Sequence, residues 1–419
     1  MEFKEIFEEW DVYARKKQLL DRDFNKLSVI NNANKKIIAI TGIRRCGKSS
    51  LLMLFERELI AGKEKVAYIN MEDSRISGKE GILDEVLKWF GDEGFLLLDE
   101  ITAIRGWEGW LARVHEQLKG KLKLIVTSSR TSMIHPSKPL RGRILHFELF
   151  PLSFKEYLSF KNIVIDSTIV NQGKLKNTLN EYIRYGGFPE VALANEEIDK
   201  IRYLESYFKD IIGLDIAEVT GDNINVVEMF ARYAIESSYF SASKCLNFFK
   251  TLGYKIGKEK LLKLESYSSA SYLFFFVKIF SYNIKDKSQY PRKVYNGDTG
   301  FYYSSTGKKD LGMQFENLIF IELRRRQKLN EEICYWKNKD GAEVDFVIKT
   351  GSSITKIIQA SYDVQQDDVK KREIKGALAS SNEFHIKTAL IITKDLNAIE
   401  HVDGIEIQFI PIIKWLLSS

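Results

Sequence analysis

The sequence predicts an α/β fold whose first domain is a parallel β-sheet layered between helices. The apolar, β-branched run at 36–41 leads through the loop GIRRCGKSS (42–50) into a segment, 50–60, that is apolar at helical spacing. A later run, FLLLD at 95–99, has the unbroken hydrophobicity of a strand buried on both faces, and LKLIVT at 122–127 is a further predicted strand. The order strand, loop, helix puts unpaired N–H groups and the positive end of a helix dipole at one edge of the sheet, where phosphate binds readily.

The composition is that of an ordinary globular protein with several domains. The 419 residues are 44% hydrophobic and 29% charged, with a formal net charge of +6, and this length predicts roughly two to four domains. No apolar run approaches the roughly 18 residues of a membrane span, and the start MEFKEIFEEW has no signal-peptide core. The single cysteines and the histidines lack disulfide or metal-ligand spacing. We therefore expect a cytoplasmic protein with no membrane partner.

The loop at 42–50 contains the Walker A pattern, Gly42-x-x-x-x-Gly47-Lys48-Ser49. The two glycines permit backbone torsions that turn successive N–H groups toward a β-phosphate. Lys48 is expected to neutralise the β- and γ-phosphates, and the Ser49 hydroxyl to ligate Mg²⁺. A glycine-rich turn without a ligand is the alternative. The pattern predicts binding of ATP and Mg²⁺ by the residues Gly42, Arg45, Cys46, Gly47, Lys48, Ser49 and Ser50.

Acidic residues end the strand at 95–99, in the Walker B pattern. Asp99 is expected to hold Mg²⁺ directly or through water, and Glu100 to orient and polarise the attacking water. Just after the strand at 122–127, Ser129 is a candidate to contact the γ-phosphate or its water, although a serine there also suits the N-cap of a helix. The carboxyl ends of parallel strands meet at one edge, so we expect these side chains beside the Walker A loop.

Five motifs give the sequence a resemblance to AAA-type ATPases of the archaeal and bacterial signal-transduction NTPase branch. They are GIRRCGKSS, FLLLDEI, LIVTSSR, LRGRILHFELFPLSFKEY at 140–157 and YGGFPEV at 185–191. The resemblance implies that the GGFP element, with Pro189, opens a helical lid and packs near the adenine. A plain helix-terminating turn is the alternative.

The same resemblance makes Arg141 and Arg143 candidates for an arginine finger that stabilises charge in the transition state. Structural arginines are the alternative. A finger acting in trans would require an oligomer, and the sequence leaves the oligomeric state open.

Residues 223–306 have the pattern of a winged helix-turn-helix. Residues 241–300 hold eleven Lys/Arg and four Asp/Glu, a net charge of +7, which leaves −1 for the rest of the chain. A basic surface suits phosphate contacts with duplex DNA, although winged helices also dock proteins. Helices are expected at 225–235, at 242 to about 252 with Ser241 as the cap, and at 258–266, with extended runs at 272–280 and 292–296. The predicted DNA contacts are Lys258, Lys260, Lys263, Lys287 and Arg292, with Lys255, Lys285 and Lys293 beside them.

The last third resembles the uncharacterised C-terminal domain attached to this ATPase family, which is similar to PD-(D/E)xK nucleases. The resemblance lies in LGMQFENLIFIELRRR from 311, CYWKNKDGAEVDFVIKTG from 334 and KIIQASYDV from 356. In those nucleases a helical acid, a strand acid and an acid-x-lysine strand hold Mg²⁺ and activate water. Glu316 and Asp345 match the two acids, but Gln359-Ala360-Ser361 stands at the third position.

A neutral amide binds Mg²⁺ poorly and serine has no ammonium group, so nuclease activity is predicted to be lost. Glu316, Glu343 and Asp345 are then relics, or part of a docking or nucleic-acid surface.

The predicted organisation has five parts. They are an N-terminal helical segment at 1–30, a P-loop ATPase core at 31–155, a helical lid at 156–222, the winged helix-turn-helix at 223–306 and a degenerate nuclease-like domain at 307–419. The predicted function is slow, Mg²⁺-dependent ATP hydrolysis that couples nucleotide state to DNA binding. The alternatives are a signalling ATPase that docks a protein partner and an ATP-regulated nuclease with a rearranged metal site.

Overall fold

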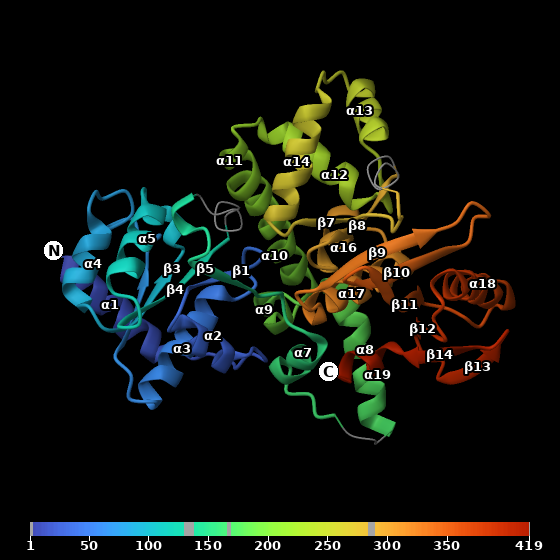
Figure 1. Cartoon of the computed structure of the whole chain (residues 1–419), viewed down its shortest axis with the longest axis horizontal. Coiled ribbons are helices and arrows are strands. Elements are labelled where there is room, and N and C mark those ends of the chain that lie inside the picture. Colours follow the sequence, from blue (N-terminus) through green and yellow to red (C-terminus); the bar gives the residue numbers. More distant parts are fainter. Residues whose placement is uncertain (1–2, 130–137, 166–168, 284–289, 419) are drawn as a thin grey trace. The chain divides into compact units, whose positions relative to one another are not determined.

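The computed structural model describes residues 3–129, 138–165, 169–283 and 290–418. The chain folds into two compact units, Met1–Leu152 and Ser153–Ser419 (Figure 1). Lys285 and Lys287, which the sequence predicts on the wing, lie outside the described residues. No helix in the described part of the chain is both long and apolar enough to cross a bilayer.

A five-stranded, all-parallel sheet forms the centre of the first unit. Its spatial order is β2-β3-β4-β1-β5. Every residue of β1 and β3 is buried, as the unbroken apolar runs predict. The predicted α/β fold with a parallel sheet is therefore confirmed. The strands are β1 (Ile37–Thr41), β2 (Val66–Asn70), β3 (Gly94–Asp99), β4 (Leu122–Ser128) and β5 (Ile144–Glu148).

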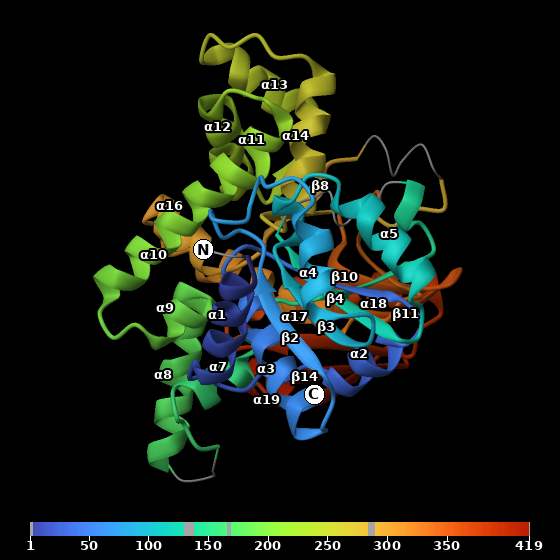
Figure 2. The ribbon, with the colours of Figure 1, turned by 90° about the vertical axis from the view of Figure 1, so that its left-hand side faces the viewer.

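Helices cover both faces of this sheet. Side chains of α1, α4 and α5 share one hydrophobic core with alternate residues of the strands, while α2 and α3 contact the strands from the other side. Helix α1 runs beside the edge strand β2 (Figure 2), and its side chains Ile6 and Phe7 belong to the same hydrophobic core. The helices are α1 (Phe3–Lys16), α2 (Lys26–Ala33), α3 (Lys48–Ala61), α4 (Ile82–Phe90) and α5 (Trp107–Gln117), with 3₁₀ turns at Ile101–Ala103 and Lys138–Leu140.

The second unit begins with a group of helices. Ser153 starts the first of them with a capping box, in which its hydroxyl accepts from the Glu156 N–H and Glu156 accepts from the Ser153 N–H. The π-helical stretch Ile211–Ala217 interrupts the last long helix. The group comprises α7 (Phe154–Phe160), α8 (Ile169–Tyr185), α9 (Pro189–Leu193), α10 (Glu197–Asp210) and α11 (Glu218–Thr220).

The GGFP segment forms the tight turn between α8 and α9, with Pro189 as the first residue of α9. Gly186 has φ +75°, and a Cβ there would lie 1.5 Å from Oδ1 of Asp298. Asp298 is buried and accepts hydrogen bonds from the N–H groups of Gly187 and Gly300, each at 2.8 Å. The two glycines therefore let the turn close over one carboxylate.

Three helices and a small antiparallel sheet follow. The sheet has the order β6-β8-β7. The predicted helices are present; Ser241 stands at the N-cap of the second but its side chain makes no capping bond. Only part of the predicted extended run 272–280 is a strand. The elements are α12 (Ile224–Ile235), β6 (Tyr239–Phe240), α13 (Ala242–Thr251), α14 (Lys258–Ala270), β7 (Phe274–Val277) and β8 (Arg292–Asn296).

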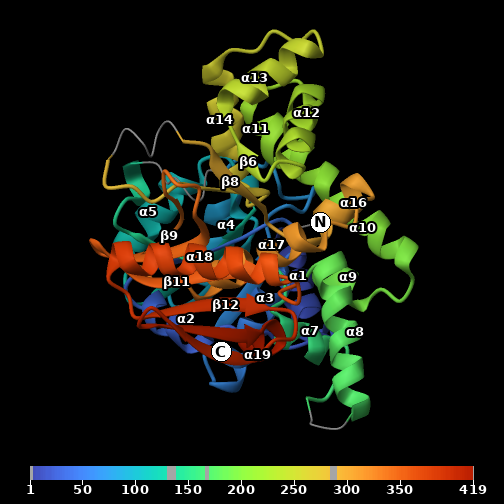
Figure 3. The same ribbon diagram turned by 90° about the vertical axis from the view of Figure 1, so that its right-hand side faces the viewer.

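A six-stranded mixed sheet ends the chain, in the order β13-β14-β12-β11-β10-β9. Helix α18 lies along one face (Figure 3), where Ala377 shares a core with Val347. Phe346 faces the other side and stacks on Phe320 of α17. The elements are α16 (Gly300–Thr306), α17 (Leu311–Arg326), β9 (Glu331–Lys337), β10 (Glu343–Thr350), β11 (Ser353–Ser361), α18 (Asp367–Phe384), β12 (Thr388–Thr393), β13 (Ala398–Val402), β14 (Ile405–Pro411) and α19 (Ile412–Leu417).

The buried carboxylate of Asp298 is expected to make the stability of the second unit depend on pH. Burial raises the pKa of Asp298 to about 7, although the Gly187 and Gly300 N–H groups and the Arg325 charge act to lower it. An unfolded aspartate titrates near a pKa of about 3.9. Between about pH 4 and pH 7 the folded unit therefore keeps a proton that the unfolded chain has released, so stability falls as pH rises, by up to about 4 kcal/mol.

Urea unfolding of the wild type and of Asp298→Asn at about pH 5 and about pH 8 measures this effect. The variant cannot titrate at this position, so its free energy of unfolding should change less between the two pH values. Equal pH dependence in the two proteins would contradict the assignment.

Candidate functional site: the carboxyl edge of the parallel sheet

The Walker A loop passes so close to a neighbouring backbone that its first glycine has no room for a side chain. A Cβ on Gly42, whose φ is +155°, would lie 2.1 Å from the Leu149 carbonyl oxygen just after β5. Gly47 has φ +103° and forms the N-cap of α3. Ser49 and Ser50 are half-buried in the first turn of that helix. The loop thus ends where α3 presents its unpaired N–H groups.

Lys48 is the first residue of α3, and its side chain folds over the loop. Its Nζ donates to the carbonyl oxygens of Gly42, at 3.0 Å, and Ile43, at 3.2 Å. The residue is buried. The ammonium group is therefore held on the loop itself by neutral acceptors, which a phosphate oxygen would outcompete because charge-assisted hydrogen bonds are stronger.

Other residues brace the loop from behind. Arg22, a buried residue between α1 and α2, donates to the carbonyls of Cys46 at 2.9 Å and Phe150 at 3.0 Å. Cys46 is buried, and its Sγ bonds the Leu149 carbonyl at 3.3 Å; burial raises the pKa of its thiol. Arg45 is exposed, with φ +71°. Cys46 therefore supports the loop, whereas Arg45 faces solvent.

The Walker B aspartate is held by two hydroxyl groups. The Tyr68 hydroxyl on β2 donates to Asp99 Oδ2 at 2.8 Å, and the Thr127 hydroxyl on β4 donates to Oδ1 at 2.5 Å. Thr127 also accepts from the Glu100 N–H at 2.9 Å. Thr127 lies on β4, the strand between β1 and β3, and it forms hydrogen bonds with the side chain of Asp99 and the backbone of Glu100.

Glu100 lies at the end of β3 in a left-handed conformation, with φ +49°. Its Oε2 accepts from the Ser129 N–H at 3.1 Å. Burial raises the pKa of Glu100, while the nearby positive charge of Lys48 lowers it. The strands before Lys48 and Glu100, β1 and β3, both pair in parallel with β4, so their carboxyl ends bring the Walker A lysine and the Walker B glutamate to the same edge of the sheet.

Ser129 is buried, and its hydroxyl oxygen has no hydrogen-bond partner among the described residues. A buried hydroxyl without a partner costs free energy, so this side chain is available to an incoming polar ligand.

The oxygens of Ser49 and Asp99 are the hard donors that Mg²⁺ prefers. Within the described ranges, no group of three His, Cys, Asp or Glu side chains is arranged to hold a metal by itself; a Mg²⁺ ion here would also need oxygens from nucleotide or water.

Arg143 lies at the opposite edge of the sheet. It precedes β5, and its carbonyl accepts from the N–H of Ile37, the first residue of β1, whereas the Walker A loop follows the carboxyl end of β1. Its guanidinium bonds Glu116 at 3.2 Å and the Pro139 carbonyl at 3.0 Å. Arg143 therefore lies away from the nucleotide site of its own chain. Its role as an arginine finger stays a prediction, and it would act on the site of a neighbouring copy.

The predicted DNA-contact residues divide into two groups. Lys258 and Lys263 are exposed on α14, and Lys255 is exposed just before it. Lys260 pairs with Asp222 at 2.9 Å, and Arg292 pairs with the buried Glu265. Lys293 is buried rather than exposed on a wing, because alternate residues of β8 face opposite sides. Among the described residues, the exposed members of the predicted surface are therefore Lys258 and Lys263 on α14 and Lys255 before it.

Comparison with known proteins agrees with this geometry. Residues 34–158 match the family described as "AAA domain". The chain is 30% identical over 433 residues to "Uncharacterized protein MJ1544" of Methanocaldococcus jannaschii, and the match covers 99% of this chain and 95% of the relative. The chain belongs to the family of this archaeal protein. Its first unit carries an AAA-type P-loop ATPase domain.

Residues 176–311 and 311–413 of this family member match two further families, each described as a domain of unknown function (DUF8612 and DUF4143). An uncharacterized protein of Haemophilus influenzae is 25% identical over 402 residues, 91% of this chain and 94% of that protein. Among solved structures, AMPPCP-bound DnaA from Aquifex aeolicus matches with 16% identity and a TM-score of 0.30, over 60% of this chain and 95% of DnaA.

Three residues that support the AAA site have no role in the sequence prediction: Tyr68, Thr127 and Arg22. Thr127 has a weak signal, since it is a polar residue at the end of an apolar strand. Tyr68 and Arg22 have none, because their roles depend on which strands are neighbours and on where the N-terminal segment packs.

Thr127→Val keeps the shape of the side chain but removes both hydrogen bonds to the acidic pair. The Glu100 N–H loses its acceptor and Asp99 loses a donor, so we expect the free energy of unfolding of the first unit to fall by about 2 kcal/mol. Tyr68→Phe removes one bond and should cost about 1 kcal/mol. Urea unfolding checks both values, and a Thr127→Val protein as stable as wild type would show that Thr127 does not hold these acids.

Proposed function

We propose that the first unit hydrolyses ATP in a Mg²⁺-dependent reaction. The observation that supports this proposal is the position of Lys48, Asp99 and Glu100 after two strands, β1 and β3, that both pair in parallel with β4 and so end at one edge of the sheet. A glycine-rich turn without a ligand does not account for a buried lysine satisfied only by loop carbonyls or for the unpartnered hydroxyl of Ser129.

Each residue has one role in this proposal. The amides of 42–48 and the Lys48 ammonium bind the β- and γ-phosphates, while Ser49 and Asp99 hold Mg²⁺, whose charge neutralises the phosphate oxygens when it is bound. Glu100 accepts a proton from the attacking water, and its raised pKa makes it a stronger base. Ser129 contacts the γ-phosphate. Water adds to the γ-phosphorus as the bond to the β–γ bridging oxygen breaks, giving ADP and phosphate.

Two variants separate binding from chemistry. Lys48→Ala is expected to weaken ATP binding at least about 100-fold, because a charge-assisted phosphate contact is lost. Glu100→Gln should keep ATP affinity within about threefold and lower turnover at least about 100-fold. Calorimetry with ATP and Mg²⁺ and a phosphate-release assay measure the two quantities.

The matched control is Lys79→Ala, which removes an exposed lysine of the same unit and should leave both quantities unchanged. Normal turnover in Glu100→Gln would remove Glu100 from the reaction. Absence of binding in the wild type would end the proposal.

We further propose that this ATPase couples its nucleotide state to binding of duplex DNA. The elements α12, α13, α14 and the sheet β6-β8-β7 have the order of a winged helix-turn-helix. Exposed lysines gather on α13, α14 and the loop between them, with Glu259 as the exposed acid among them; these lysines are Lys244, Lys250, Lys255, Lys258 and Lys263. Such a group suits phosphate contacts. That Pro189 packs near the adenine remains a prediction from the family resemblance.

Gel shifts with duplex DNA, with and without ATP and at two salt concentrations, test DNA binding. Lys255→Ala/Lys258→Ala should weaken the complex for all sequences and reduce the slope of log affinity against log salt by about 2. Lys339→Ala/Lys387→Ala, which removes two exposed lysines elsewhere in the second unit, should change neither. If no shift appears while ATP turnover persists, a protein partner replaces DNA as the proposed target.

A further inference from the structure

The second unit contains a buried lysine surrounded by carboxylates. Lys293 Nζ lies 2.6 Å from Asp345 Oδ1, 3.0 Å from Glu316 Oε1 and 3.3 Å from Glu343 Oε1. The lysine belongs to β8, while the three acids belong to α17 and β10. Its side chain is 6% exposed. The ammonium group of a residue on the small β6-β8-β7 sheet is therefore enclosed by carboxylates from α17 and from the six-stranded sheet.

The three carboxylates also accept hydrogen bonds from other groups of the protein. Asp345 Oδ2 accepts from the Ala360 N–H at 2.9 Å. Glu316 also accepts from the Tyr295 hydroxyl at 2.7 Å. Glu343 accepts from the Tyr239 hydroxyl and from Lys337. The cluster thus has a donor for each acid without any added ion.

The electrostatics of the cluster favour a charged lysine. Burial alone would lower the pKa of Lys293, but the charges of Asp345 and Glu316 raise it well above its usual value. A buried ammonium is stable only when paired and hydrogen-bonded, and this one meets both conditions. Lys293 Nζ donates hydrogen bonds to Asp345 and Glu316 and forms an ion pair with Glu343.

We propose that Lys293 is the resident cation of this cluster and that its ammonium group keeps a divalent metal from binding among Glu316, Glu343 and Asp345. The cluster is then a metal-independent joint that ties the β6-β8-β7 sheet to the C-terminal sheet. It is also closed to metal-assisted hydrolysis of a phosphodiester, because the position that would activate water holds an ammonium group.

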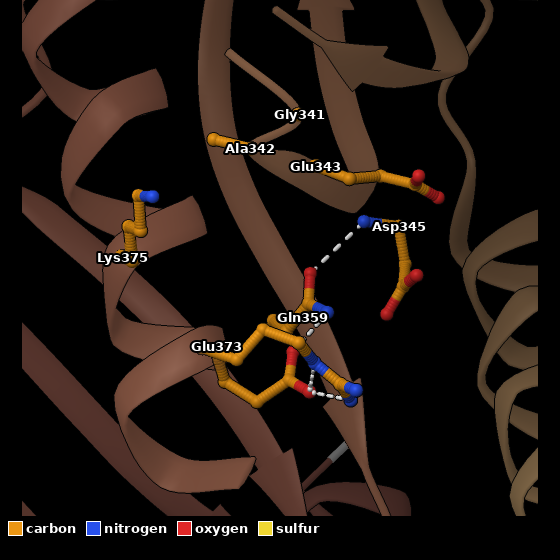
Figure 4. A pocket seen from close by; sticks show the side chains of 8 residues that line it. Gly341, Ala342, Glu343, Asp345, Gln359, Glu373 and Lys375 are labelled. Carbon is orange, nitrogen blue, oxygen red and sulfur yellow. Dashed lines mark hydrogen bonds and ion pairs between the residues drawn. The ribbon is translucent and has the colours of Figure 1, made fainter. Parts of the chain in front are cut away.

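A pocket beside the cluster is also arranged without a metal ion. It has a volume of about 370 Å³ and is lined by Glu343, Asp345, Gln359 and Glu373 among others (Figure 4). Gln359 replaces the acid expected there, and its amide joins two groups: Oε1 accepts from the Asp345 N–H at 3.0 Å, and Nε2 donates to Glu373. Glu373 also pairs with Arg372 at 2.5 Å. The amide is thus used as a crosslink, a role that a carboxylate could not fill since it has no donor.

Titration of the full chain with Mn²⁺ in the absence of nucleotide, followed by electron paramagnetic resonance, tests the proposal. Wild type and Asp345→Asn should bind Mn²⁺ equally weakly. Lys293→Met should gain one site at least about tenfold tighter, and Lys293→Met/Asp345→Asn should lose it. Circular dichroism checks that each variant folds. A folded Lys293→Met protein with no added site would overturn the proposal.

Lys293→Met leaves three acids without their cation and can prevent folding. Lys293→Met/Glu316→Gln removes one charge of each sign, and this variant should still bind Mn²⁺ more tightly than Glu316→Gln alone; equal affinities would count against the proposal. The wild type supplies an independent test. Mn²⁺ binding, or Mn²⁺-dependent cleavage of DNA, that disappears in Asp345→Asn would show that a metal and not Lys293 occupies the cluster.

Discussion

The nucleotide site depends on a close approach between two backbones. The Leu149 carbonyl occupies the space where a side chain on Gly42 would be and accepts from the Cys46 thiol, and the next carbonyl, that of Phe150, accepts from Arg22. Contacts on the rear of the loop hold its backbone in one shape before any ligand arrives. Preorganised amides do not have to be ordered when phosphate binds, and so the interaction is stronger than it would be for a mobile loop.

A comparable constraint governs the charged residues of β8. Alternation along a strand sends Arg292 to Glu265 and Lys293 to the carboxylate cluster. These two adjacent basic residues, which the sequence predicts to contact nucleic acid, instead form ion pairs within the second unit, one on each face of the small sheet. Among the described residues of the segment 241–300, most of the exposed lysines lie on α13, α14 and the loop between them. Net charge along a segment predicts its partners poorly when the segment contains a strand with packing on both faces.

Much of the first unit could be predicted from the sequence because its signals are local. The run before Gly42, the Walker A spacing and the continuous apolar strand before Asp99 each depend on neighbouring residues alone. The roles of Thr127 and Tyr68 depend on strand order, which places β4 between β1 and β3, and no local pattern encodes that order. The burial of Lys293 likewise depends on acids that lie 23 and 52 residues away in the chain. The π-helical stretch at Ile211–Ala217 has no signal among its own residues.

The Gly186–Gly187 turn has a mechanical consequence. Its amide and the first amide of α16 share the two oxygens of Asp298, and Asp298 follows β8 by two residues. Steric fit leaves no slack at Gly186, so a displacement of the turn would pull Asp298 with it. The start of α9 and the end of β8 would then move together as one rigid group. A hinge in the second unit would have to lie outside this group.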